Sequence, residues 1–245
     1  MNVNIGGGRG WKHDGWRNFD QADGFFLTPD TMFPVDTGSA DIVYSSHCFE
    51  HLDDATVDRM LDETWRMLKP AGTFVLKLPD FDDVLRRWRY GDEKWFDAWG
   101  QAKVWPTWKN RSVPININTK AAMIFCGWWN DEYGNEFGPT HERRPDAEGA
   151  YHGPAEIRHP FSYAGQLRFG RPHDIASSMR TGVPSHGHFN HRNAWSRSEM
   201  MALLTDHSLL PVRTGRDVAE SWCQIPGIND HRHISMYFEA KPCQP

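Results

Sequence analysis

The sequence has 245 residues, a formal net charge of −5 and 24% charged residues. A chain of this length can bury a sizeable core, and we expect one domain, residues 1–245, with a large insertion. Its lysines and arginines are dispersed, so the charge gives no footprint for nucleic acid or an acidic membrane. The four cysteines form no C-x-x-C pair, which argues against zinc ribbons and thioredoxin-type redox sites.

Nothing in the sequence predicts a membrane protein. No apolar run approaches the roughly 20 residues that span a bilayer. Met1 leads directly into an apolar strand, so no signal peptide is expected. These features predict a protein of the cytoplasm.

The first fifty residues carry the most informative pattern. An apolar strand at residues 3–5 runs directly into three glycines at 6–8, and glycine lets backbone amides approach a ligand closely. A second apolar strand at 41–44 ends in two serines and a histidine, residues 45–47. If the two strands are parallel, these residues share one edge of the sheet, where α/β folds bind ligands.

The glycine run does not match the common nucleotide loops. Trp11 stands where the dinucleotide pattern G-x-G-x-x-G needs its third glycine, which makes a nicotinamide oxidoreductase a poor fit. The phosphate loop G-x-x-x-x-G-K-[ST] does not occur. Three glycines alone are equally compatible with a flexible turn.

Hydrophobic periodicity predicts strands alternating with helices, and hence a mainly parallel α/β sheet. Asp53 or Asp54 can cap the first helix, which a proline and a glycine within residues 69–72 end. Further on, Ile234, Met236 and Phe238 alternate as in an antiparallel strand. The later elements are expected at residues 73–78 (strand), 198–207 (helix), 210–213 (strand) and 234–239 (strand).

Residues 81–194 differ from their flanks. They are rich in Trp, Pro, Gly and His, and show little periodicity beyond a helix-like stretch near 83–99. A long irregular segment inside a compact fold is usually functional or disordered, and its aromatic content argues against disorder. We therefore expect a core of residues 1–80 and 195–242 with an insertion that covers the crevice and forms an acceptor pocket. The alternative is a second packing layer with no role in substrate binding.

Several short motifs, in this order, resemble the class I methyltransferases that use S-adenosylmethionine (SAM), in particular the short bacterial type 11-like group. The resemblance implies a Rossmann-like sheet, mainly parallel with an antiparallel C-terminal strand. It covers residues 3–80 and returns at 233–242. The motifs are the glycine run after the first strand, Gly15-Trp16-Arg17-Asn18-Phe19-Asp20, Phe33-Pro34-Val35, Ser39-Ala40-Asp41-Ile42-Val43, Glu50-His51-Leu52 and Leu68-Lys69-Pro70-Ala71-Gly72.

The resemblance implies roles for the first cofactor-binding residues. Gly6, Gly7 and Gly8 would let the chain pass against the methionine part of SAM. Asp20, after the second strand, would accept hydrogen bonds from the ribose hydroxyls, a task that suits a carboxylate. The alternative for Asp20 is an ordinary turn residue.

Further residues are implied at the adenine and near the sulfonium. Phe33 stands where the family packs an apolar side chain on adenine. Thr28 departs from the family, which often has an acidic residue there, and Asp30 lies two positions further on. Ser45 and Ser46 lie past the strand that ends beneath the sulfonium.

His47 is the candidate general base, because an imidazole can accept a proton near neutral pH. The alternative is that it hydrogen-bonds the backbone and orients its loop. Glu50 and His51 have a structural role in the family. Methyl transfer from SAM is a direct displacement at the methyl carbon. It needs a base only when the methyl acceptor is a hydroxyl or a protonated amine.

The expected function is methylation of a small molecule or sugar-type acceptor on oxygen or nitrogen, with SAM as cofactor and a homodimer as a form to test. A non-catalytic binding module of this fold and a nucleotide-cofactor enzyme of the same fold are the alternatives. The histidines His186, His188 and His191 could also ligate zinc, although no cysteine or carboxylate lies beside them and the family generally needs no metal.

Overall fold

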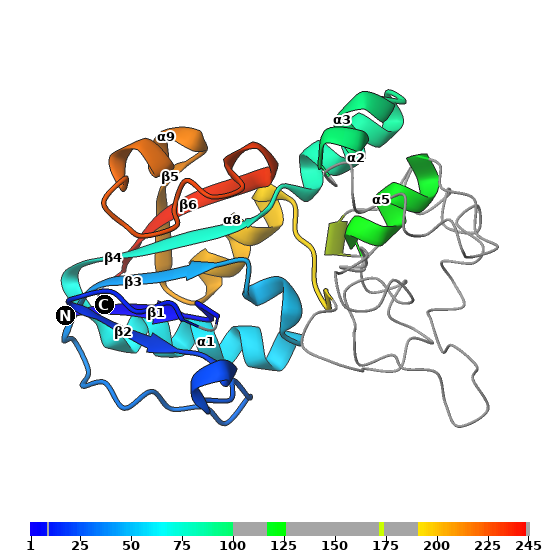
Figure 1. Ribbon diagram of the computed structural model, residues 1–245. Coiled ribbons are helices and arrows are strands. Elements are labelled where there is room, and N and C mark those ends of the chain that lie inside the picture. The colour runs from blue at the N-terminus through cyan, green and yellow to red at the C-terminus, as the bar shows by residue number, and fades with distance from the viewer. Residues whose placement is uncertain (9, 100–116, 126–171, 174–190, 244–245) are drawn as a thin grey trace, which may run out of the picture. The chain divides into compact units, whose positions relative to one another are not determined.

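The computed structural model describes residues 1–8, 10–99, 117–125, 172–173 and 191–243 (Figure 1). The chain divides into two compact units. One consists of residues 1–80 and 197–245, and the other of residues 81–196. None of the helices in the described ranges is both long enough and apolar enough to cross a membrane.

The first unit is built on a mixed sheet with the strand order β2-β1-β3-β4-β6-β5. Strands β1 to β4 pair in parallel, whereas β6 runs antiparallel to both of its neighbours, β4 and β5. The α/β class and the antiparallel C-terminal strand expected from the sequence are confirmed. The strands are β1 (Asn2–Ile5), β2 (Trp16–Phe19), β3 (Ala40–Ser46), β4 (Leu68–Pro79), β5 (Leu209–Thr214) and β6 (Ser235–Pro242).

The C-terminal strand differs from its expected form in one respect. The alternation of Ile234, Met236 and Phe238 is the pattern of an antiparallel strand, which commonly has one packed and one solvated face. In the structure Tyr237 and Phe238 are both fully buried, because β6 lies inside the sheet and both faces are covered. Ile234 belongs to a short 3-10 helix, Arg232–Ile234, that precedes the strand.

Helix α1 (Asp54–Met67) begins at the cap that its sequence predicts. The Asp53 carboxylate accepts a hydrogen bond from the Thr56 N–H at 2.9 Å, which satisfies one of the free amides of the first turn. The helix runs into β4 without a loop, so this strand starts at Leu68, five residues before the predicted position. Helix α8 (Arg197–Asp206) lies close to its predicted range.

Helix α9 (Arg216–Ser221) was not expected. It lies on the face of the sheet opposite to α1 (Figure 1). Only residues 6–15 join β1 to β2, which leaves this face without the helix of a longer crossover. The segment between β5 and β6 covers it instead. Its apolar side chains pack on three strand residues: Val218, Ala219, Ile225 and Ile228 contact the cluster of Tyr44, Val75 and Tyr237, with Trp11, Trp16 and Trp222 at the border.

The second unit contains α2 (Phe81–Arg89), α3 (Glu93–Trp99) and α5 (Ile117–Phe125) in its described part. The helix-like stretch near 83–99 is thus two helices, separated at Gly91, whose φ of +68° favours glycine. His191 is buried and its Nδ1 lies 2.8 Å from the Ile124 carbonyl oxygen. His186 and His188 lie outside the described residues, so the zinc hypothesis stays untested.

Candidate functional site

The glycine loop, Asp20 and the residues at the end of the third strand lie at the carboxyl edge of the parallel strands. Ile5 at the end of β1 pairs with Phe19 of β2 and with Ser45 of β3. On the other side of β3, Ser46 pairs with Lys77 near the end of β4. Because β6 is antiparallel, its first residues lie at the same edge. This is the edge where open α/β sheets bind ligands.

The glycine loop leaves no room for side chains at its first two positions. A Cβ on Gly6 would lie 2.1 Å from the Cys48 Sγ, and Gly6 also has a φ of +74°. A Cβ on Gly7 would lie 2.1 Å from the Asn4 side-chain nitrogen. Gly6 is therefore required by packing and by its backbone conformation, whereas a side chain at Gly7 would have to displace the hydrogen-bonded side chains of Asn4 and Asn18.

The Asp20 carboxylate ties the glycine loop to the end of β2. Its Oδ2 accepts a hydrogen bond from the Gly8 N–H at 3.0 Å, and its Oδ1 accepts one from the Ala22 N–H at 2.7 Å. The structure thus brings Asp20 and Gly8 together, as a shared binding site requires. Each carboxylate oxygen has a second lone pair, so these contacts leave the group able to accept from a ligand.

The segment that follows β2 supplies a cluster of aromatic rings. Phe33 is buried. Its ring stacks on that of Phe25, with the ring centroids 5.3 Å apart, and packs edge-on against Phe19, with the centroids 4.9 Å apart. Phe26 in the same segment is exposed. Thr28 is also exposed, and its N–H donates to the Thr31 hydroxyl.

The carboxylate of Glu63 in α1 holds this aromatic segment in place. The Phe33 N–H donates to Glu63 Oε2 at 2.8 Å, and Arg66 forms an ion pair with the same oxygen at 2.7 Å. Burial acts to raise the pKa of Glu63, but the hydrogen bonds from Arg66 and Phe33 outweigh it and hold the pKa below its usual value. The aromatic segment is therefore anchored to α1 by a charged group.

The two serines at the end of β3 differ in their surroundings. Ser45 is fully buried, and its hydroxyl donates to the Ile5 carbonyl at 2.9 Å, which joins the ends of β1 and β3. Ser46 is partly exposed at the end of the strand. The neighbouring Cys48 is buried, and this burial raises the pKa of its thiol, which keeps it protonated.

His47 is held in an uncommon backbone conformation with a φ of +49°. Its Nε2 lies 2.9 Å from the Ser235 hydroxyl, and its Nδ1 lies 3.3 Å from Glu50 Oε1. Glu50 is fully buried, whereas a quarter of the His47 side chain is exposed. The ring is thus fixed between a carboxylate and a hydroxyl.

The sequence analysis missed two groups at this edge, Lys77 and His231. Lys77 is 1% exposed, and burial lowers the pKa of its ammonium group to about 8. Its position inside the apolar strand 73–78 was the available signal, because a lysine is rarely buried without a specific partner. His231 gave no such signal, since only the fold brings it from the C-terminal segment to the ring of His47, 6.1 Å away.

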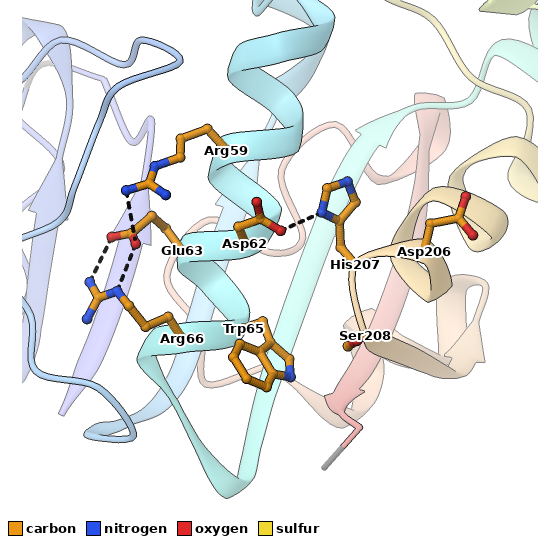
Figure 2. A pocket seen from close by; sticks show the side chains of 8 residues that line it. All are labelled: Arg59, Asp62, Glu63, Trp65, Arg66, Asp206, His207 and Ser208. Carbon is orange, nitrogen blue, oxygen red and sulfur yellow. Dashed lines mark hydrogen bonds and ion pairs between the residues drawn. The ribbon is translucent and has the colours of Figure 1, made fainter. Parts of the chain in front are cut away.

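A separate pocket of about 360 Å³ lies at the amino edge of the sheet, between the last turns of α1 and the end of α8 (Figure 2). His207 lies between two carboxylates of α1, with Nδ1 2.8 Å from Asp62 and Nε2 3.2 Å from Asp58. Since β5 begins at Leu209, this pocket lies at the opposite edge from the glycine loop. It contains none of the residues predicted to bind the cofactor.

Comparisons with known proteins agree with the sequence-based resemblance. Residues 15–76 match the family described as a methyltransferase domain. This match spans about a quarter of the chain and agrees with the resemblance to methyltransferases found in the sequence. No curated protein matches the chain.

Solved structures that resemble the chain do so at low identity. One is the S-adenosylmethionine-dependent methyltransferase of Mesorhizobium loti, with 14% identity, a TM-score of 0.39, and coverage of 98% of this chain and 89% of that one. Another is the PH0226 protein of Pyrococcus horikoshii, with 13% identity, a TM-score of 0.41, and coverage of 98% and 81%. A third is the geranyl diphosphate C-methyltransferase of Streptomyces coelicolor, with 13% identity, a TM-score of 0.38, and coverage of 98% and 73%.

Proposed function

We propose that the protein is a SAM-dependent methyltransferase that acts on a small-molecule or sugar-type acceptor at oxygen or nitrogen. The observation that carries this proposal is the close packing around Gly6 and Gly7 beside the Asp20 carboxylate, in a chain whose residues 15–76 match the family described as a methyltransferase domain. That match indicates SAM as the cofactor. When bound, SAM supplies an electrophilic methyl group on a sulfonium.

The residues at the carboxyl edge fit such a cofactor. Gly6, Gly7 and Gly8 are partly exposed, and the Gly6 and Gly8 amides donate to the Phe19 carbonyl and to Asp20, which fixes the path of the loop past the site. The lone pairs of Asp20 that remain suit ribose hydroxyls. Adenine would lie at the aromatic segment, and because Phe33 is 2% exposed, we expect its contact to involve the exposed Phe26 as well.

The reaction asks little of the protein beyond alignment. Holding a donor and an acceptor in line gives effective molarities of about 10⁵–10⁸ M in well-oriented intramolecular reactions. Ser46 ends β3, the neighbour of β1, and His47 follows it, and both are suited to position the acceptor. We propose the insertion, residues 81–194, as the acceptor pocket within a single methyltransferase domain.

Binding measurements test the proposal directly. We expect S-adenosylhomocysteine and SAM to raise the melting temperature by mass action and to bind in calorimetry, with NAD as the matched negative control. An enzyme of this fold that uses a different nucleotide cofactor would respond to NAD instead. Binding of SAM without transfer of a labelled methyl group to any member of a hydroxyl and amine library would favour a non-catalytic binding module.

Two further expectations accompany this function. The protein is proposed to work in the cytoplasm and to need no partner beyond its small-molecule acceptor. A homodimer is the oligomeric form to test, by light scattering of the purified chain with and without S-adenosylhomocysteine.

A further inference from the structure

The turn that leads into β6 is held by side chains of the sheet. Its main-chain carbonyls accept hydrogen bonds from three donors: Lys77 to Gly227 at 3.1 Å and to Asp230, Tyr237 to Ile228 at 3.1 Å, and Ser235 to His231 at 2.9 Å. All three donors are buried. These bonds satisfy four of the five carbonyls from Gly227 to His231 and fix the turn, because a buried donor left unpaired is costly.

This fixed turn presents His231 at the carboxyl edge. His231 has a φ of +53°, and its ring lies 6.1 Å from that of His47, which has a φ of +49°. Two facing histidines that both hold a left-handed backbone are unusual, and such conformations gather at functional sites. The turn also borders the glycine loop, since Trp11 packs on the cluster that contains Ile228.

Two neighbouring side chains orient the ring of His47. The Ser235 hydroxyl donates its proton to the His231 carbonyl, so it accepts from the Nε2–H of His47. The other ring nitrogen faces the Glu50 carboxylate at 3.3 Å. Both ring nitrogens of His47 are thus engaged by residues of the protein.

His231 is different, because its ring forms no hydrogen bond with any residue in the described ranges, and the residue is exposed. Partial burial of the ring lowers the pKa of His231, and the neighbouring His47, Lys77 and His233 lower it further, against the opposite effect of Asp230. At neutral pH the imidazole is thus uncharged and can accept a proton.

We propose that His231 accepts the proton of the methyl acceptor, and that His47, held by Glu50 and Ser235, positions the acceptor group. This inference rests on the proposed methyl transfer and assigns the acceptor as a hydroxyl or a protonated amine. His231 takes the proton as the acceptor atom forms its bond to the methyl carbon and the bond from that carbon to sulfur breaks. The products are the methylated acceptor, S-adenosylhomocysteine and a protonated His231.

Nuclear magnetic resonance of protein labelled with ¹³C in its histidine rings tests this placement without an acceptor. Two probes are compared: S-adenosylhomocysteine, whose sulfur is uncharged, and sinefungin, which has a protonated amine where SAM has its transferring methyl. If His231 faces that position, sinefungin should lower the pKa of His231 relative to the S-adenosylhomocysteine complex by roughly 0.5–2 units, the Coulomb effect of a charge at about 6–8 Å. His207 at the opposite edge is the internal control, and its titration should be the same in both complexes.

The outcomes separate the two proposals. If both probes bind and the pKa of His231 does not differ between them, this inference is wrong while the proposed function stands. If neither probe binds, both are wrong. His231→Asn assigns the resonance and tolerates the left-handed backbone, and His231→Gln replaces it should the first variant fail to fold.

Once an acceptor is found, kinetics give a second readout. We expect His231→Asn to lower kcat by about 10²–10⁴-fold at neutral pH with unchanged S-adenosylhomocysteine affinity, and this loss to shrink as the acceptor ionises at higher pH. His207→Asn is the matched control and should keep its turnover. Equal turnover of His231→Asn and wild type at every pH would overturn the assignment.

Discussion

The two halves of the carboxyl edge of the sheet consist of different kinds of chemical group. On the β1–β2 side, the site is shaped by two glycines whose Cβ positions are occupied by neighbouring side chains and by one carboxylate bound to two main-chain amides. On the β3–β4–β6 side, ionisable side chains dominate, with His47, Lys77 and His231 close to the strand ends. Steric contacts and backbone geometry determine the shape of the first half, whereas the protonation of its side chains determines the properties of the second.

This difference suggests that the first half binds the cofactor and the second half acts on the methyl acceptor. Main-chain recognition suits a cofactor whose shape is constant, because it depends on close approach. Ionisable groups suit the acceptor, whose proton has to leave. Changes to the first half should therefore alter stability and cofactor affinity, and changes to the second should alter pH dependence.

The largest effect is expected for Gly6→Ala. The new Cβ would meet Cys48 Sγ at 2.1 Å, which adds an overpacking cost of about 1–3 kcal/mol to the roughly 1–2 kcal/mol of a left-handed backbone. Urea unfolding measures the loss. Gly15→Ala is the matched control, because Gly15 has a similar φ of +79° and nothing within 4 Å of its Cβ. Equal losses in the two variants would show that Cys48 does not restrict the loop.

Asp20→Ala should weaken SAM binding by about 1–3 kcal/mol, or roughly 5–150-fold, because the Gly8 and Ala22 amides lose their acceptor and the ribose loses its partner. Calorimetry gives the affinity. Asp23→Ala is the control, since that exposed carboxylate accepts from the Asn18 side chain and not from the glycine loop. Unchanged affinity in Asp20→Ala would return Asp20 to the role of a turn residue.

The sequence predicted the half of the edge that depends on local geometry. Strand–glycine junctions and a capped helix are local patterns, so the first strand, the Asp53 cap and the antiparallel C-terminal strand could be predicted. The segment between β5 and β6 could not, because its packing depends on the short connection between β1 and β2. That is a property of the whole fold.

The same reasoning explains the missed site residues. His47 was predicted because it directly follows a strand, whereas His231 is brought to it from 184 positions away in the sequence, the difference of the two residue numbers. Long-range pairs of this kind leave no periodic signal. Lys77 could have been noticed as a charge within an apolar strand, but its partners Gly227 and Asp230 could not.

Lys77→Met tests whether the second half depends on pH. The native pKa of Lys77 is about 8, below its ordinary 10.5, so between these values the unfolded chain binds more protons than the native one. The stability of the wild type should therefore rise with pH across this window, relative to the variant, by at most about 1.4 kcal/mol for each pH unit. Urea unfolding at pH 7.5 to 10 measures it. Lys69→Met, at a more exposed lysine paired with Asp41, is the control, and a parallel pH profile for both variants would contradict the burial of Lys77.

The smallest effect is expected for Ser235→Ala, which removes one hydroxyl between the two histidines. His47 loses an acceptor and the His231 carbonyl loses a donor, and we expect a loss of stability of about 0.5–1.5 kcal/mol. The partial exposure of His47 lets water replace one of these bonds, which keeps the cost at this scale. Ser39→Ala is the matched control, because that serine donates to the Asp36 carbonyl at an exposed turn. S-adenosylhomocysteine affinity, measured by calorimetry, should stay unchanged in both variants because neither touches the glycine loop. A loss of affinity in Ser235→Ala alone would show that the two halves of the edge are energetically coupled.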